Sequence, residues 1–184
     1  MNKGAINVSI QLNVLSGEIN PTKMNPIKNN LSALKPSGGL WTSSYDPFIG
    51  SDWVQYSFQV GGFRVPDNET WDGYLLYPNK DVRIYTIDSY KDLESLMKQY
   101  RVKSKLKFPN FYARRVNYSI DFEKISQEYD AIHLTKKGHL LTKKSYPYNL
   151  DGWDVESTIW FRWVFDKTVP VQEAFVREKE IIAI

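Results

Sequence analysis

Residues 152–161 read Gly-Trp-Asp-Val-Glu-Ser-Thr-Ile-Trp-Phe, a stretch whose alternation predicts a well-buried β-strand. Successive side chains of a strand point to opposite faces. One face carries Trp153, Val155, Ser157, Ile159 and Phe161, and it is core-like. The other carries Asp154, Glu156, Thr158, Trp160 and Arg162. This second face suits either a half-solvated sheet surface or the floor of a ligand cleft, and Glu156 is the best candidate for chemistry in the chain.

The composition predicts a folded protein with one domain, residues 1–184. Of the 184 residues, 42% are hydrophobic and 15% are aromatic, which excludes a disordered chain and favours strands and stacking surfaces. The formal net charge of +3 is too small to indicate a nucleic-acid partner by itself, because only clustered charge steers a ligand. The distribution of the charge matters more than its sum.

The sequence contains no cysteine and only two histidines, His133 and His139. The lack of cysteine excludes disulfides, thiolate zinc sites and cysteine nucleophiles. The two histidines have no obvious carboxylate companion nearby, so their spacing predicts no metal site. A metalloenzyme is therefore not expected.

The chain carries no run that approaches the roughly 18 apolar residues of a membrane span. The N-terminal segment alternates without a continuous apolar core, unlike a secretory leader. We therefore expect a soluble, unprocessed protein in the cytoplasm, with no membrane partner.

Period-two patterns and capping signals predict many strands and a few short helices. Strands are expected over residues 6–14, 40–43, 74–77, 82–87, 131–135, 155–165 and 181–184. Helices are expected between Ile27 and Pro36, from the Ser51-Asp52 cap, from the Asp88-Ser89 cap, and over 119–128. The cap at Asp88-Ser89 precedes an apolar face of Leu93, Leu96, Met97 and Tyr100. Strands with few, irregularly spaced helices favour an α+β fold over a doubly wound sheet.

Two common classes of enzyme site are excluded by their motifs. The pairs Gly38-Gly39 and Gly61-Gly62 lack both the phosphate-loop lysine spacing and a full dinucleotide fingerprint. No Gly-x-Ser-x-Gly occurs, so a serine hydrolase with a nucleophile elbow is not expected.

Residues 98–115 combine basic and aromatic side chains without an acid. Its cations are Lys98, Arg101, Lys103, Lys105, Lys107, Arg114 and Arg115, interleaved with Tyr100, Phe108, Phe111 and Tyr112. Such a mixture suits a strand of nucleic acid, through phosphate pairing and base stacking. A solvated basic loop beside a helix end is the alternative interpretation.

The order of three short elements resembles the ADP-ribosyltransferase superfamily. The elements are Gly-Gly-Leu-Trp-Thr-Ser at 38–43 with a tryptophan-bearing helix after it, Tyr-Asp-Ala-Ile at 129–132, and the strand with Glu156. In that family a Gly-x-Leu-Trp/Tyr-x-Ser/Thr segment lines the nicotinamide pocket, and a Tyr-Asp-Gly-Ile-like strand precedes the strand of the catalytic glutamate. The resemblance spans about residues 35 to 165. It implies an ADP-ribosyltransferase-like split sheet, antiparallel or mixed, in a single domain.

The resemblance implies NAD as the substrate and Glu156 as the catalytic residue. Cleavage of the nicotinamide–ribose bond passes through an oxocarbenium-like state, which a carboxylate stabilises by offsetting positive charge. By the same resemblance Gly39 belongs to the nicotinamide pocket, and Trp41 and Trp53 form its aromatic walls. Ser43 would orient the ribose or the carboxamide.

The first strand departs from the family pattern, because it offers only Asn, Ser and Gln where the family has Arg or His. Lys35 would then meet the NAD pyrophosphate as a point charge. His133 is a further candidate to approach NAD, although its apolar neighbours are also typical of a structural histidine.

The leading hypothesis is NAD-dependent transfer of ADP-ribose to a macromolecular acceptor, either protein or nucleic acid. An NAD glycohydrolase would share the site and use water as the acceptor. A third hypothesis is a non-catalytic module that binds nucleic acid or protein through the basic stretch. Its binding residues would be Lys103, Lys105, Lys107, Arg114 and Arg115.

Overall fold

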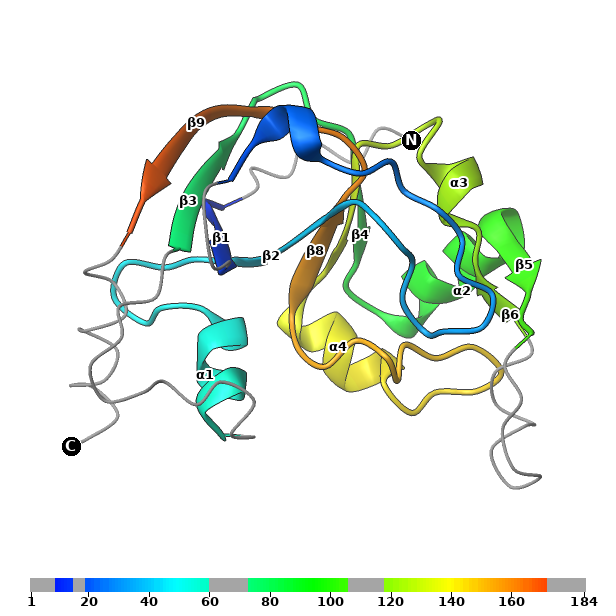
Figure 1. Ribbon diagram of the computed structural model, residues 1–184. Helices are drawn as coiled ribbons and strands as arrows, with labels where there is room; N and C mark the ends of the chain where they lie inside the picture. Colours follow the sequence, from blue (N-terminus) through cyan, green and yellow to red (C-terminus); the bar gives the residue numbers. More distant parts are fainter. Residues whose placement is uncertain (1–8, 15–18, 60–72, 106–117, 172–184) are drawn as a thin grey trace. The chain divides into compact units, whose positions relative to one another are not determined.

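The computed structural model describes residues 9–14, 19–59, 73–105 and 118–171, and these fall into two compact units (Figure 1). The first unit draws its described residues from the ranges 1–21, 42–82 and 164–184. The second unit is formed by residues 22–41 and 83–163. Strands and four short α-helices together make the fold α+β, as the sequence predicted.

The first unit contains antiparallel strands around β1 (Gln11–Val14). β1 pairs with β2 (Leu40–Ser44) on one side and with β3 (Gly73–Pro78) on the other. β9 (Phe165–Pro170) pairs with the far edge of β3. The helix α1 (Asp52–Gln59) begins after Ser51, whose Oγ accepts a hydrogen bond from the Trp53 backbone N–H at 3.2 Å. The expected strand at 74–77 and the expected helix after Ser51 are both confirmed.

Both faces of β1 are buried, although the alternation of apolar and polar residues in this stretch is typical of a strand with one buried face. Gln11 and Asn13 are as buried as Leu12 between them. Gln11 keeps its polar group satisfied by accepting a 2.6 Å hydrogen bond from Thr42 Oγ1 on β2. A hydrogen-bonded amide can be buried at little cost, so polar side chains do not mark a solvated face here.

The sheet of the second unit is mixed. The strand β4 (Ile84–Ile87) runs parallel to β7 (Ala131–Leu134), and β7 runs antiparallel to β8 (Ser157–Trp160). A separate hairpin pairs β5 (Arg101–Lys103) with β6 (Tyr118–Ile120).

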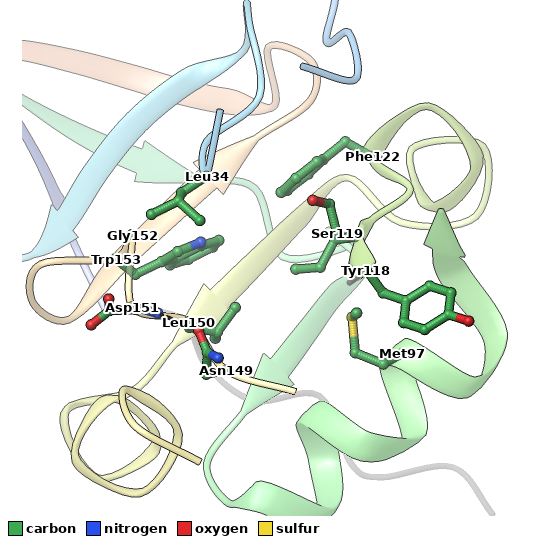
Figure 2. Close-up of a pocket in the computed structure, with 11 residues that line it drawn as sticks. Leu34, Met97, Tyr118, Ser119, Phe122, Asn149, Leu150, Asp151, Gly152 and Trp153 are labelled. Carbon is green, nitrogen blue, oxygen red and sulfur yellow. Dashed lines mark hydrogen bonds between the residues drawn. The ribbon is translucent and has the colours of Figure 1, made fainter. Parts of the chain in front are cut away.

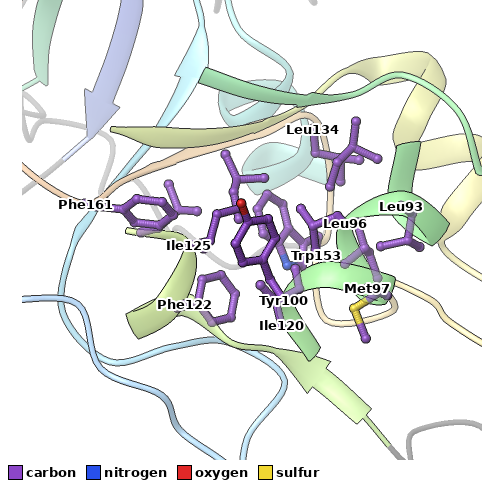
Figure 3. Close-up of a cluster of buried hydrophobic side chains, with 14 of the residues drawn as sticks. Leu93, Leu96, Met97, Tyr100, Ile120, Phe122, Ile125, Leu134, Trp153 and Phe161 are labelled. Atoms are coloured by element: carbon purple, nitrogen blue, oxygen red, sulfur yellow. The ribbon is translucent and has the colours of Figure 1, made fainter. Parts of the chain in front are cut away.

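The helix α2 (Tyr90–Tyr100) covers the core face of this sheet. Its N-cap is Ser89, and its buried face is Leu93, Leu96, Met97 and Tyr100, as the sequence predicted. Figure 3 shows these side chains against Leu134, Trp153 and Phe161 in one cluster. The cluster covers one face of the sheet, and His133 of β7 and Thr158 of β8 lie on the opposite face.

Several predicted elements are wrong or incomplete. Residues 27–36 form no helix, because Lys28 and Ser37 exchange two backbone hydrogen bonds that close a loop between them. The expected helix over 119–128 is only α3 (Phe122–Ile125), which follows β6 directly. The strand expected over 155–165 is two strands, because β8 ends at Trp160 and β9 begins at Phe165, where the chain pairs with β3 instead of β7.

Beyond the strands β5, β6 and β9, which no pattern predicted, the structure adds one helix and one 3-10 turn that were not anticipated. The helix α4 (Lys136–Thr142) is capped by Thr135, whose Oγ1 accepts from the Gly138 N–H at 2.9 Å. A single turn of 3-10 helix, η1, covers Pro21–Lys23. The expected strand at 181–184 and the first residues of the expected strand at 6–14 lie outside the described residues.

Candidate functional site

The register of the second unit's sheet aligns three polar residues in a row. His133 on β7 lies opposite Thr158 on β8 and beside Thr86 on β4. Paired residues of adjacent strands project to the same face of a sheet. Thr86, His133 and Thr158 therefore share the face opposite to the apolar core, and they provide the setting for Glu156.

Glu156 lies one residue before β8, and its side chain is only 7% exposed. One carboxylate oxygen, Oε1, is 3.5 Å from Nδ1 of His133. The same Nδ1 is 2.8 Å from Oγ1 of Thr158. The structure thus brings together two of the residues predicted for the site, Glu156 and His133, and adds Thr158 as a second partner of the imidazole.

The contact between His133 and Glu156 is not an ion pair at neutral pH. Burial lowers the pKa of the His133 imidazole to about 4, and the nearby Asp88 carboxylate only partly opposes this effect. A neutral imidazole carries one N–H, and a neighbouring carboxylate favours its placement on Nδ1. His133 can then orient both Glu156 and Thr158 without contributing a positive charge.

Asp88 occupies the end of β4 beside this row and is itself held by two donors. Thr135 Oγ1 donates to one carboxylate oxygen and Lys137 Nζ to the other, each at 2.7 Å. These hydrogen bonds lower the pKa of Asp88, so its carboxylate stays ionised. The Asp88–Lys137 pair lies near the surface, which limits its effect on stability.

Thr86 supplies an unusual polar atom. Its Oγ1 is buried and has no hydrogen-bond partner, although the residue as a whole is half-buried. An unpaired buried hydroxyl costs free energy comparable to a lost hydrogen bond. Sequence reasoning gave no signal for Thr86, whereas Thr158 was visible only as a residue on the same strand face as Glu156.

A second cluster in the same unit surrounds Trp41. The Lys35 ammonium is 2.8 Å from Asp154 Oδ2 and 5.5 Å from the centroid of the Trp41 ring. The Trp41 ring meets the buried Trp153 edge-on, with centroids 4.8 Å apart. Lys35 is therefore engaged by a carboxylate and a tryptophan in the present structure, and a phosphate would have to compete with Asp154 for it.

The loop before β2 needs both of its glycines. Gly38 and Gly39 adopt φ angles of +72° and +69°, a region that other residues rarely enter. A Cβ on Gly38 would lie 2.1 Å from the Pro26 carbonyl oxygen, and one on Gly39 would lie 2.8 Å from that of Trp160. The Gly-Gly pair thus lets the loop pack directly on β8, whatever else it does.

The remaining predicted residues of the NAD site belong to the first unit. Ser43 is fully buried on β2, opposite Leu12 of β1. Trp53 lies in the first turn of α1 and is half-buried. The second unit therefore contains only part of the predicted NAD site, namely Glu156, His133, Lys35, Gly39 and Trp41.

The basic stretch is described only in part. Lys103 ends β5 and Lys105 follows it, both exposed. Lys107, Arg114 and Arg115 lie outside the described residues.

A small cavity in the second unit is lined by none of the predicted site residues. It has a volume of about 30 Å³ and lies between Met97, Tyr118, Leu150 and Trp153 (Figure 2). A volume of this size holds roughly one water molecule. Among the described residues there is no cluster of three or more His, Asp or Glu side chains that could hold a metal ion. None of the described helices has the length and apolar character needed to cross a membrane.

Comparisons with known proteins give no family or relative from which a function could be inferred, so the inference of function rests on the residues of the chain. No protein-family model, no curated protein and no solved structure matches the chain.

Proposed function

We propose that the protein transfers ADP-ribose from NAD to a macromolecular acceptor, with Glu156 as the catalytic carboxylate. The observation that carries this proposal is the contact of a buried carboxylate with a neutral imidazole. The side chains of Glu156 and His133 are 7% and 13% exposed, and burial holds the pKa of His133 near 4. At neutral pH the uncharged imidazole orients Glu156 without forming an ion pair with it.

Such a carboxylate suits a reaction in which positive charge develops. When the bond between nicotinamide nitrogen and ribose C1′ breaks, its electron pair leaves with nicotinamide and C1′ gains cationic character. The acceptor then forms a bond to C1′ and gives up its proton to solvent. A negative charge fixed in a site of low dielectric stabilises the cationic transition state more than the neutral-ribose ground state.

His133 and Thr158 act in this scheme as positioning residues. The Nδ1 atom of His133 lies 3.5 Å from the carboxylate and 2.8 Å from the threonine hydroxyl, so both partners restrict where the imidazole can turn. Side chains locked by such contacts keep a carboxylate in one geometry, which preorganises the site.

The resemblance to ADP-ribosyltransferases supplies the roles of the other residues in this proposal. Within the second unit, Trp41 would form a wall for the nicotinamide ring and Gly39 would line its pocket. Lys35 would exchange Asp154 for the pyrophosphate, which carries more charge than a single carboxylate.

The proposal is tested by incubating the purified protein with NAD labelled in the adenylate part, alone and with cell lysate. Free nicotinamide and label in protein and nucleic acid are then measured. Glu156→Gln should lower both by at least about a hundredfold, the usual loss for removing one electrostatic catalytic group. Glu94→Gln is the matched control, because it makes the same change in an exposed carboxylate of α2 that pairs with Lys98.

Three results would count against the proposal. If the wild-type protein neither binds NAD nor releases nicotinamide, the transfer reaction is refuted. Equal activity of the Glu156→Gln variant would refute the role of Glu156. Nicotinamide release without label in any macromolecule would identify a glycohydrolase instead.

A further inference from the structure

Four residues of the second unit form a basic aromatic surface on the β5–β6 hairpin. We call Arg101, Lys103, Tyr118 and Tyr148 the hairpin surface. Lys103 lies directly opposite Tyr118 in the antiparallel register, and Arg101 is two positions before Lys103 on the same strand. The three side chains therefore project from one face of the hairpin. Tyr148 reaches this face from the loop after α4.

Contacts between these side chains hold the cation and the rings in place. The Arg101 guanidinium carbon is 4.8 Å from the centroid of the Tyr118 ring, and the guanidinium donates a hydrogen bond to the Tyr148 hydroxyl. The Tyr118 and Tyr148 rings meet edge-on with centroids 6.4 Å apart. Because guanidinium and rings are already ordered, a ligand would lose less conformational entropy on binding here.

Three residues of the hairpin surface are exposed, and the strands of the hairpin carry no acidic residue. Tyr118 is 42% exposed, and Arg101 and Lys103 are also exposed. No Asp or Glu occurs between Glu94 and Asp121. Lys105 adds a third exposed cation, and its backbone N–H donates to the Leu31 carbonyl at 2.8 Å, which anchors the end of the strand.

We propose that the hairpin surface binds single-stranded nucleic acid. Arg101, Lys103 and Lys105 would pair with successive phosphates, and an unpaired base would stack on the exposed Tyr118 ring. A duplex keeps its bases stacked on one another and cannot use that ring. The cavity of about 30 Å³ beside Tyr118 is too small for a base, so the base stays at the surface.

This binding stands on the hairpin surface alone and goes beyond the proposed reaction. If the reaction also holds, the bound strand is the acceptor of ADP-ribose, and only that step rests on the proposed function. A variant at Glu156 therefore separates the two, because Glu156→Gln should bind nucleic acid like the wild type.

The test is a titration of fluorescein-labelled 12-mers of single-stranded DNA and RNA, and of the DNA duplex, followed by anisotropy at several salt concentrations. With three phosphate contacts, the logarithm of the association constant should fall with the logarithm of salt at a slope of about −2. The double variant Arg101→Ala with Lys103→Ala leaves one phosphate contact and should flatten the slope to about −0.7. Tyr118→Ala should weaken binding about tenfold or more without changing the slope.

A charge-matched control uses two exposed lysines that are not part of the hairpin, Lys91 on α2 and Lys167 on β9. Lys167 also lies over a tyrosine, 5.3 Å from the centroid of the Tyr77 ring, so it tests whether any lysine–tyrosine contact suffices. Replacing both with alanine should leave binding unchanged. If the Arg101 variant does not fold, the exposed pair Lys103→Ala and Lys105→Ala removes the same number of charges and gives the same comparison.

The proposal is supported when the wild type binds either single strand and the hairpin variants lose binding that the control retains. Binding of DNA alone or RNA alone then identifies the sugar that the surface prefers. The proposal is overturned by no binding of the wild type, by equal losses in the hairpin and control variants, or by a duplex that binds as tightly as the single strand.

Discussion

Replacing His133 with asparagine should remove a loss of stability that the wild-type protein shows in mild acid. The folded protein holds the pKa of His133 near 4 because the imidazole is buried, whereas the unfolded chain returns it to its ordinary value of 6.5. Between these two values the unfolded chain binds a proton that the folded protein excludes. Stability from this group is therefore complete above about pH 6.5 and disappears as the pH falls toward 4.

The size of this loss follows from the two pKa values. One pKa unit corresponds to about 1.4 kcal/mol, so the full difference amounts to about 3 kcal/mol in the free energy of unfolding. The His133 side chain is only 13% exposed, so solvent screening removes little of it. Asp88 does not obscure the effect, because its pKa lies below the ordinary 3.8 and its contribution is lost only at lower pH.

The measurement is urea unfolding followed by tryptophan fluorescence at intervals from pH 4 to 8. The wild type should lose about 3 kcal/mol across this range beyond what the His133→Asn variant loses. The control variant His139→Asn makes the same change at the other histidine. It should retain the acid-induced loss in the free energy of unfolding that His133 causes. If His133→Asn falls as steeply as the wild type, the imidazole is not excluded from protonation and its proposed neutral contact with Glu156 is refuted.

Two further predictions concern stability at pH 7, measured as midpoints of denaturant unfolding. Thr158→Val should destabilise the protein by about 1–3 kcal/mol, because it leaves the buried Nδ1 of His133 without its 2.8 Å partner. Thr86→Val should be neutral or stabilising, because the Thr86 hydroxyl has no partner to lose. Equal effects of the two substitutions would contradict this assignment of the hydrogen bond. Gly38→Ala should lower the free energy of unfolding by at least about 2 kcal/mol, and by more than Gly39→Ala does. The reason is that its new Cβ would lie 2.1 Å from a carbonyl oxygen, whereas the Cβ at Gly39 would lie 2.8 Å from one. A tolerated alanine at Gly38 would show that the loop can move.

The sequence predicted elements well where a local signal determined them. The Ser89 cap and the apolar spacing from Leu93 to Tyr100 defined α2, and these residues form the core as expected. Alternation placed β7 and β8, and that was enough to single out Glu156. These features depend on period and capping, which neighbouring residues in the chain determine.

The sequence was a poor guide where contacts distant in the chain decided the outcome. Hydrogen bonds between Lys28 and Ser37 replaced an expected helix, and pairing of β8 with β7 but of β9 with β3 divided an expected strand. The role of Thr86 depends on its register with His133, which no pattern within either strand specifies. The sequence therefore predicted individual residues of the candidate site, but it did not predict that Thr86, His133 and Thr158 align across three strands.

The pairing of β9 with β3 has a consequence for the order in which the chain can fold during synthesis. β3 ends at Pro78, and its partner β9 begins at Phe165, so the ribosome must complete the second unit before this edge can close. Until then the backbone groups of β3 remain open to pairing with another chain. A nascent chain stalled before Phe165 would thus present a free strand edge to chaperones or to its neighbours on the polysome, even with the core around α2 already formed.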